Sequence, residues 1–447
     1  MVRGCRAGLA TVVATVAVAA LAAAAKPKVI VMTDGEIDDR SSMIRFLLYT
    51  CDVDLKAIIE TNSMFQRRGH SGDDWYERQL DAYERIYPNL AAHRSGCPTA
   101  DEIRAVSFVG DEDEAHLAGI GRRPQRPGED VELDPEDWPD TPGSDRIVDV
   151  LLEDDPAPVH IQAWGGGNTA ARAFAKLKRD HAEDYERAVS KAVMFNIWYQ
   201  DDAGNFIETH HPGVTMVYCG AFAGTWNYHS QEDTFDFIRD HVKTGHGPLG
   251  ALYPQDYVSE GDSPAFFYVL PNGLRNAEHP GFGGWGGRYE RVAGLANVYR
   301  DARDNGDRKA SLKRWIDDAN ADFQARMDWT ASADFEAANH PPDVHVDTDL
   351  DLTLYAGQRI VFDASKSTDP DGDALTFDWS HYAQAGTYRG RVELAPSGPG
   401  QARFTAPEVS TGETVHILLA VRDDGDPPLA SYARMIVTVV PPAVFDE

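Results

Sequence analysis

The sequence predicts an α/β fold with a largely parallel sheet and helices on both faces, followed by a β-sandwich. Apolar strands near residues 28–33, 55–60, 158–163 and 192–198 are separated by longer helical stretches, a pattern typical of a parallel sheet. The expected helices cover residues 41–51, 73–87, 144–153 and 169–179. After residue 340 the helical pattern ends, and short strands separated by turn residues begin.

The ends and length of the chain indicate an exported protein with two domains. A chain of 447 residues is long enough for a substantial core in each of two domains. We expect residues 1–25 to be a signal peptide, because Arg3 and Arg6 precede a short apolar run that ends in alanines. The length of the run and its small residues favour a cleaved leader over a permanent membrane anchor, so a secreted or periplasmic location is predicted.

Charge and cysteine content restrict the partners. A formal net charge of −30 argues against nucleic acid polymers and anionic membranes, since phosphate groups would be repelled. It is compatible with divalent cations and neutral polymers. Beyond the leader only Cys51, Cys97 and Cys219 remain, and the sequence leaves open whether one pair is bridged. No cysteine or histidine spacing indicates zinc.

Two long segments have less regular patterns. Residues 110–142 are crowded with Asp, Glu, Pro and Arg, which predicts a long loop or lid, and loops of that length are usually functional or disordered. Residues 297–339 have a charged, helical pattern, with Trp315, Phe323 and Trp329 expected to pack on the main body.

A turn rich in carboxylates follows the first strand. Asp34, Glu36, Asp38 and Asp39 come directly after an apolar segment that ends at Met32 and Thr33. Ligands of parallel sheets bind at the carboxyl ends of the strands, and closely spaced carboxylates repel unless a cation lies between them. Ca²⁺ accepts several oxygen ligands in irregular geometry. The alternative is an acidic turn that caps the helix beginning near Arg40.

This turn resembles the DxDxxxDD motif of the metal-dependent nucleoside N-ribohydrolases, with Met32 in place of the first aspartate. The resemblance implies Asp34 and Asp39 as calcium ligands. It further implies Asp34 as the catalytic base for the attacking water, and Asp38 as a substrate-binding partner of sugar hydroxyls.

Two further segments resemble the same family. Asn62 follows the strand at 55–60 and corresponds to a sugar-contacting asparagine, although a turn asparagine is the alternative. In the strand and glycine turn at 159–171 the resemblance implies Gly167 as a main-chain calcium ligand and Asn168 as a substrate-binding residue. Trp164 is either a sugar platform or a core tryptophan. A phosphate loop is the weaker interpretation, because neither GxxxxGK[ST] nor GxGxxG is present.

A fourth segment, at 259–267, resembles the motif that supplies the last calcium carboxylate, here Asp262. Gly261 stands where many family members have a histidine that assists the leaving base. General-acid assistance of about 10²–10⁴-fold must then come from elsewhere or be absent. Glu260 is a candidate substrate-binding residue nearby, and His210 and His211 lie in another loop.

Stretches at 162–166, 260–264, 271–274 and 284–289 narrow the resemblance to nucleoside hydrolase-like proteins joined to a C-terminal domain described as cellulose-binding. The segment at 199–204 resembles the QDD loop of this branch, which implies Gln200 and Asp201 as substrate contacts at the rim; a solvated acidic turn is the alternative. The expected domains are residues 26–340, nucleoside hydrolase-like, and residues 341–447.

The C-terminal segment is expected to be an immunoglobulin-like sandwich. Seven short strands are predicted. They cover residues 344–346, 352–354, 359–362, 375–379, 402–404, 415–421 and 433–439. The DPDGD turn at 369–373 resembles turns of polycystic-kidney-disease-type and cadherin-like repeats, which are structural and sometimes helped by calcium. Trp379 is expected in the core, whereas His381, Tyr382 and Tyr388 are candidates for an exposed carbohydrate surface.

Two functions follow from these features. The first is a secreted, calcium-dependent hydrolase of N-glycosidic bonds in nucleosides or related glycosides, with a carbohydrate-binding C-terminal domain. The alternative is a non-catalytic or weakly catalytic protein that binds cellulose or another polysaccharide and uses the hydrolase-like cleft to capture a sugar.

Overall fold

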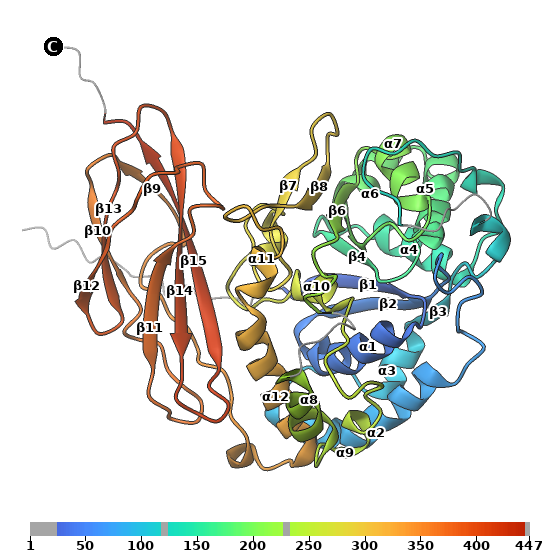
Figure 1. Cartoon of the computed structure of the whole chain (residues 1–447). Helices are drawn as coiled ribbons and strands as arrows, with labels where there is room; N and C mark the ends of the chain where they lie inside the picture. The colour runs from blue at the N-terminus through green and yellow to red at the C-terminus, as the bar shows by residue number, and fades with distance from the viewer. Residues whose placement is uncertain (1–24, 118–123, 227–232, 443–447) are drawn as a thin grey trace, which may run out of the picture.

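A computed structural model describes residues 25–117, 124–226 and 233–442. Its main feature is an eight-stranded sheet of order β3-β2-β1-β4-β5-β6-β8-β7, in which only the edge strand β7 runs antiparallel to its neighbour (Figure 1). The strands are β1 Lys28–Thr33, β2 Asp54–Glu60, β3 Ser107–Val109, β4 Val159–Ala163, β5 Ala192–Ile197, β6 Thr215–Cys219, β7 Tyr289–Arg291 and β8 Val298–Asp301.

Helices cover both faces of this sheet, as predicted (Figure 1). They are α1 Ile37–Tyr49, α2 Trp75–His93, α3 Ala100–Ala105, α4 Pro142–Leu152, α5 Asn168–Asp180, α6 Tyr185–Lys191, α7 Ala203–His210, α8 Asp233–Ile238, α9 Gly247–Gly250, α10 Ser263–Phe267, α11 Ala310–Lys313 and α12 Ile316–Ala331. Successive strand residues point to opposite faces. Val29 and Val31 therefore pack with α1 and α2, and Ile30 and Met32 pack with α4 and α5.

The strongest strand and helix patterns are confirmed, namely β1, β2, β4, β5, α1, α2, α4 and α5. The helical prediction for 297–339 is wrong at its start, because β8 Val298–Asp301 forms a strand that pairs in parallel with β6. The strand has only four residues, two apolar or aromatic followed by two charged, which is too short for a period-two pattern to stand out from the charged residues that follow it. Trp315, Phe323 and Trp329 are buried in the core, as predicted.

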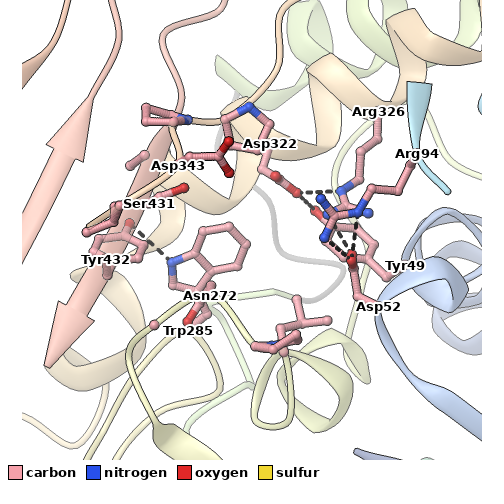
Figure 2. Close-up of a pocket in the computed structure, with 17 residues that line it drawn as sticks. Tyr49, Asp52, Arg94, Asn272, Trp285, Asp322, Arg326, Asp343, Ser431 and Tyr432 are labelled. Atoms are coloured by element: carbon pink, nitrogen blue, oxygen red, sulfur yellow. Dashed lines mark hydrogen bonds and ion pairs between the residues drawn. The ribbon is translucent and has the colours of Figure 1, made fainter. Parts of the chain in front are cut away.

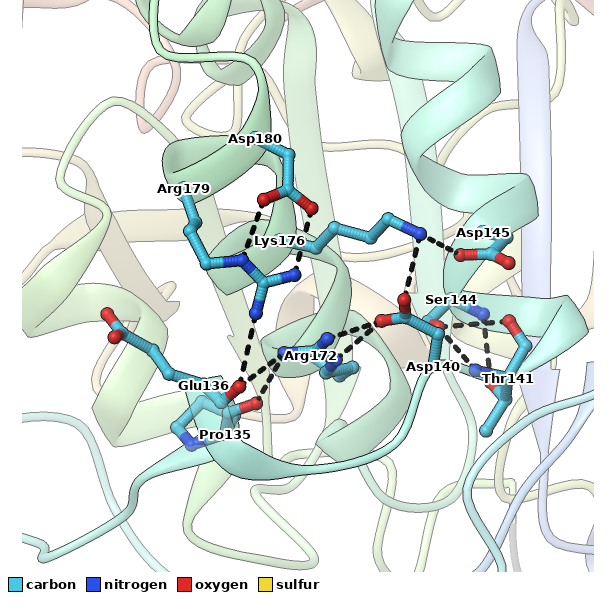
Figure 3. Close-up of polar contacts among 10 residues, drawn as sticks. All are labelled: Pro135, Glu136, Asp140, Thr141, Ser144, Asp145, Arg172, Lys176, Arg179 and Asp180. Carbon is cyan, nitrogen blue, oxygen red and sulfur yellow. Dashed lines mark hydrogen bonds and ion pairs between the residues drawn. The ribbon is translucent and has the colours of Figure 1, made fainter.

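The last part of the acidic segment at 110–142 is held against α5 (Figure 3). Arg172 donates to the Asp140 carboxylate and to the carbonyls of Pro135 and Glu136. Lys176 joins Asp140 to Asp145. Residues 135–140 thus form a fixed surface loop, whereas residues 118–123 lie outside the described residues.

The C-terminal part is a sandwich of two sheets, with strand orders β10-β13-β12 and β11-β14-β15-β9. The strands are β9 Asp351–Tyr355, β10 Arg359–Asp363, β11 Thr376–His381, β12 Leu394–Gly398, β13 Gln401–Thr405, β14 Glu413–Arg422 and β15 Ala430–Val440. Six of the predicted strands are present. Residues 344–346 do not form a strand, and β12 was not predicted because Pro396 and Gly398 interrupt its pattern.

Several sandwich side chains are buried against the first domain. Tyr382 was expected at an exposed carbohydrate surface, but it is 1% exposed and its hydroxyl donates to Asp304 Oδ2 at 2.7 Å. Arg434 donates to the carbonyls of Leu274 and Gly283. Tyr432 belongs to the same hydrophobic core cluster as buried residues of α1 and α2. The division at residues 340 and 341 therefore remains a prediction, since one core crosses it.

A pocket of about 300 Å³ lies at this junction (Figure 2). One of its walls is an ion-pair network around Arg326, whose guanidinium contacts Asp52 Oδ2 and Asp322 Oδ2 at 2.8 Å each. The same group lies 3.9 Å from the centre of the Tyr49 ring. Arg94 also pairs with Asp52. Although burial opposes it, Arg326 and Arg94 hold the pKa of Asp52 below its ordinary value.

The structure also answers two questions, one about cysteine pairing and one about membrane-spanning helices. Cys51 and Cys97 form a disulfide, and Cys219 is a buried free thiol, which settles the pairing that the sequence left open. In the described part of the chain, no helix combines the length and apolar character needed to cross a membrane.

Replacement of Arg326 by Ala is expected to lower the free energy of unfolding by about 3–5 kcal/mol, because two buried carboxylates lose their shared cation. Chemical denaturation of the full chain measures this change. Arg403 is exposed on the sandwich, and R403A serves as the control, with a change of less than about 0.5 kcal/mol. Equal effects of the two variants would contradict a stabilising role of the network.

Candidate metal and substrate site

Four aspartates meet at the carboxyl end of β1. Carboxylate oxygens of Asp38, Asp39 and Asp262 lie within 4.8 Å of one another, and all three residues are buried. Asp38 and Asp39 lie in the first turn of α1, and Asp262 directly precedes α10. Asp34 contacts Asp39 and is only 1% exposed. The structure therefore brings together the three carboxylates predicted as metal ligands and adds Asp38, which the sequence assigned to sugar hydroxyls.

Hydrogen bonds fix these carboxylates and leave oxygens available. Asp39 Oδ1 accepts from Thr33 Oγ1 at 2.5 Å and from the Asp34 amide at 3.1 Å. Asp34 Oδ1 accepts from the Glu36 amide at 3.1 Å. Among the described residues, Oδ2 of Asp34 and Oδ2 of Asp262 are buried without a hydrogen-bond partner. Buried polar atoms are rarely left in this state, so a ligand or cation is the natural partner.

The pKa values of these aspartates favour binding of a cation. Burial raises the pKa of Asp34. Burial, together with the charges of Asp34 and Asp38, raises the pKa of Asp39 well above its ordinary value. Burial and the charges of Asp39 and Asp38 do the same for Asp262. An oxygen-only, carboxylate-rich set of this kind fits a hard divalent cation.

The glycine turn after β4 approaches the acidic group closely. A Cβ atom at Gly165 would lie 2.6 Å from the Cβ of Asp34, and one at Gly166 would overlap the carbonyl oxygen of Asn62. Only glycine fits such approaches. The carbonyl of Gly167 accepts a hydrogen bond from the Ala171 amide at 2.9 Å inside α5. A calcium ion bound by Gly167 would have to share this oxygen.

Asp201 fixes the backbone of this glycine turn through hydrogen bonds. Its Oδ2 accepts from the amides of Gly167 at 2.6 Å and Asn168 at 2.9 Å, and its Oδ1 accepts from the Ala203 amide at 3.0 Å. Burial outweighs these bonds and raises the pKa of Asp201 to about 7. Gln200 is also buried, and its amide donates to the Trp164 carbonyl at 2.5 Å. Neither residue lies at an exposed rim as expected; both position the backbone.

Three predicted substrate-binding residues retain free polar atoms inside the protein. Both side-chain polar atoms of Asn168, Oδ1 of Asn62 and Oε1 of Gln200 are buried and have no hydrogen-bond partner among the described residues. The Asn62 amide donates to the Arg67 carbonyl at 3.2 Å. These groups could bind the hydroxyls of a sugar.

Two predicted substrate contacts are corrected. Trp164 is fully buried and packs against Phe46 and Phe266 at ring-centre distances of 5.7 and 6.2 Å, so it is a core tryptophan. Glu260 is also fully buried and lies 2.7 Å from Arg45 Nε. Tyr253 and Ser263 donate to the same carboxylate, which therefore has no oxygen directed at a substrate.

The position of the missing histidine is filled by the aspartate cluster. A Cβ atom at Gly261 would overlap Asp38 Oδ2. His211 cannot substitute, because it lies just before the amino end of β6, at the opposite edge of the sheet, where it contacts the Tyr185 hydroxyl at 2.7 Å. Burial lowers the pKa of His211 to about 3.

Ser63 and His70 were not predicted. Ser63 and His70 both lie close enough to Asp34 to lower its pKa, against the larger effect of burial. His70 also contacts Asp73 at 2.8 Å and Gln66 at 2.9 Å. The signal that was available is position, since both residues belong to the polar loop that follows β2 at the same sheet edge.

Comparisons with known proteins agree with this fold. The model of the family "Cellulose-binding Sde182, nucleoside hydrolase-like domain" matches residues 28–289, and that of "Cellulose-binding protein Sde0182, C-terminal domain" matches residues 359–439. A nucleoside hydrolase-related hypothetical protein from Saccharophagus degradans, described as associated with carbohydrate metabolism, is similar along 93% of this chain and 100% of its own. It has 32% sequence identity and a TM-score of 0.80.

Other similarities are too weak to use. The effector protein XOO4466 has 11% identity over 71% of this chain and 95% of its own, with a TM-score of 0.38. A PKD domain from KIAA 1837 protein has 22% identity over 24% of this chain and 92% of its own, with a TM-score of 0.18. No curated protein sequence matches.

The fold and the acidic group define a nucleoside hydrolase-like protein with an appended β-sandwich. The chain belongs to the Sde182 family of cellulose-binding, nucleoside hydrolase-like proteins.

Replacement of Asp201 by Asn is expected to lower the free energy of unfolding by about 1–3 kcal/mol, because the amide nitrogen cannot accept and at least one buried N–H loses its partner. Thermal and chemical unfolding measure the loss. The side chain of the neighbouring Asp202 accepts a hydrogen bond from Gln125 at 2.9 Å, so D202N is a matched control with a smaller effect. A larger loss in D202N would contradict the positioning role of Asp201.

Proposed function

We propose that this protein is a secreted, calcium-dependent hydrolase of N-glycosidic bonds in nucleosides or related glycosides, whose C-terminal domain binds a polysaccharide. The observation that carries the proposal is the buried group of Asp38, Asp39 and Asp262 beside Asp34, with unpartnered oxygens on Asp34 and Asp262. The Cys51–Cys97 disulfide supports an oxidising location outside the cytoplasm.

The roles of the residues follow from their positions. Asp34, Asp39 and Asp262 would hold the cation, which when bound lowers the pKa of a water molecule and neutralises the group. Asp34 Oδ2, which no protein group occupies among the described residues, is placed to take the proton of the attacking water. Asn62 and Asn168 would orient the sugar through their free amide atoms.

Departure of the leaving group is the step for which this chain differs from the family pattern. Gly261 provides no acid, and Glu260 is locked to Arg45. His70 is a candidate, because its Cβ lies next to Gly35 and it interacts electrostatically with Asp34; its ring would first have to release Asp73 or Gln66. Without such an acid, substrates with a good leaving group would be cleaved preferentially, since general-acid catalysis contributes about 10²–10⁴-fold.

Replacement of Asp34 by Asn should abolish calcium-dependent cleavage, because the amide cannot accept the proton of the attacking water and is a weaker ligand. Calcium titration by calorimetry, followed by an assay against nucleosides and N- and O-glycosides, tests this. Asp101 is a well exposed carboxylate that does not belong to the buried acidic group, and D101N is the control. We expect loss of about 10³-fold or more in D34N and no loss in D101N.

The possible outcomes separate the two functions. Calcium binding without turnover on the whole panel would remove the hydrolase and leave a sugar-binding protein. Absence of calcium binding to the unaltered protein would remove the metal assignment itself.

Polysaccharide binding by the sandwich is favoured by the match to the C-terminal domain of a cellulose-binding protein. With Tyr382 buried, half-buried Tyr388 remains an accessible aromatic candidate for this surface. Replacement of Tyr388 by Ala should weaken binding of the full chain to cellulose about three- to tenfold, equal to about 0.7–1.4 kcal/mol. Tyr355 is exposed on β9, and Y355A is the control. A loss of cellulose binding only in Y355A would instead place the binding surface on β9.

A further inference from the structure

A second pocket lies at the same sheet edge as the aspartates but has the opposite charge. Its volume is about 520 Å³. Its lining includes side chains at the carboxyl ends of β5, β6 and β8, together with the loop after residue 123. The charged members are Arg126, Arg300, Arg303, Arg308, Glu290 and Asp301. Four arginines against two carboxylates give local positive charge in a chain of net charge −30.

The arginines have few close carboxylate partners, although the charge of Arg308 acts to lower the pKa of Asp301 in the same pocket. In the described ranges, the side chains of Arg126 and Arg308 have no ion pair or hydrogen bond to a carboxylate. Arg300 lies 3.8 Å from Glu290, and Arg303 donates to a carbonyl, that of Gly306, at 3.4 Å. Asp301 is engaged by the Gly220 amide at 2.9 Å.

Two aromatic rings complete the pocket. Trp198 and Tyr218 line it and are half-buried. Trp198 has a φ of 60°, a left-handed conformation that bulky residues rarely adopt. Although burial raises the pKa of Tyr218 to about 12, both Arg126 and Arg308 act to lower it, which places both guanidinium groups near the same phenol.

The pocket is one aromatic layer from the aspartates. Trp198 packs edge-on against Phe222 at 4.6 Å. The ring of Phe222 lies 3.4 Å from the Cβ position of Gly261, beside Asp38. A molecule that extends past Trp198 could therefore contact both regions.

We propose that this pocket binds the anionic group of an acidic sugar, with the guanidinium groups of Arg126 and Arg308 on the oxyanion and the rings of Trp198 and Tyr218 against the sugar. Arginine matches carboxylate and phosphate groups with paired N–H donors, and an aromatic face suits the apolar side of a sugar ring. The anion is either a uronate carboxylate or a sugar phosphate. Binding of this kind does not require that the aspartates be catalytic.

The test uses the full chain and three probes of similar size: D-glucuronate, D-glucose 6-phosphate and neutral D-glucose. Calorimetry or tryptophan fluorescence measures the affinities. We expect at least one anionic sugar to bind about tenfold or more tightly than glucose, with weaker binding as salt rises from about 0.05 to about 0.5 M. Preference for glucuronate would identify the carboxylate as the anion, and preference for glucose 6-phosphate would identify the phosphate.

The variants separate this pocket from general charge. The double variant R126Q/R308Q should lower the affinity for the anionic sugar about tenfold or more. Arg239 and Arg403 are exposed elsewhere, and R239Q/R403Q has the same net charge, so it should retain the affinity. Replacement of Trp198 by Ala should weaken binding of the anionic sugar but not binding of inorganic phosphate. Binding should persist in D34N, which keeps this result independent of catalysis.

Three results would overturn the proposal. The first is no binding of either anionic sugar at about 10 mM. The second is an equal loss in R126Q/R308Q and R239Q/R403Q. The third is inorganic phosphate binding as tightly as the sugars, with no effect of W198A, which would leave a site for simple anions only.

Discussion

Repulsion among buried carboxylates is the constraint around which the first domain is built. Asp34, Asp38, Asp39 and Asp262 are all removed from water, and the pKa values of Asp39 and Asp262 are raised by their neighbours as well as by burial. Folding must therefore bring together groups that oppose each other. The amino end of the 13-residue helix α1 supplies a favourable dipole for Asp38 and Asp39, and hydrogen bonds from Thr33 and the Asp34 amide fix Asp39. A cation would remove the remaining repulsion.

How much could be predicted depended on whether a residue's role was set locally. The strand before Asp34 and the helix after it are local patterns, so β1, α1 and the meeting of the acids at a sheet edge followed from the sequence. The roles of Trp164 and Glu260 were not local. Trp164 is covered by Phe46 and Phe266, and Glu260 is neutralised by Arg45, residues that are distant in sequence. No periodicity or turn signal indicates which distant segment will cover a side chain.

The arginine pocket also could not be predicted from local sequence patterns. Arg126 and Arg308 are 182 positions apart in the numbering, and nothing in either segment indicates that they share a pocket. The net charge disfavours polyanions at long range, where fields add over the whole molecule. Salt screens charges that lie farther away than about 8–10 Å, so only the nearest charges act strongly on a bound ligand. A strongly acidic protein can therefore bind a small anion at a local group of arginines.

One loop connects the sandwich to this pocket. The segment between β8 and α11 supplies Arg303 and Arg308 to the pocket, and its Asp304 accepts a hydrogen bond from buried Tyr382 of the sandwich. Asn305, next in the chain, accepts from Gln384 at 3.2 Å. Because Asp304 also binds Arg288, the loop is fixed from both sides. A polymer held on the sandwich would then lie at a defined distance from the pocket, so the two domains would act on one extended ligand rather than as independent modules on a flexible linker.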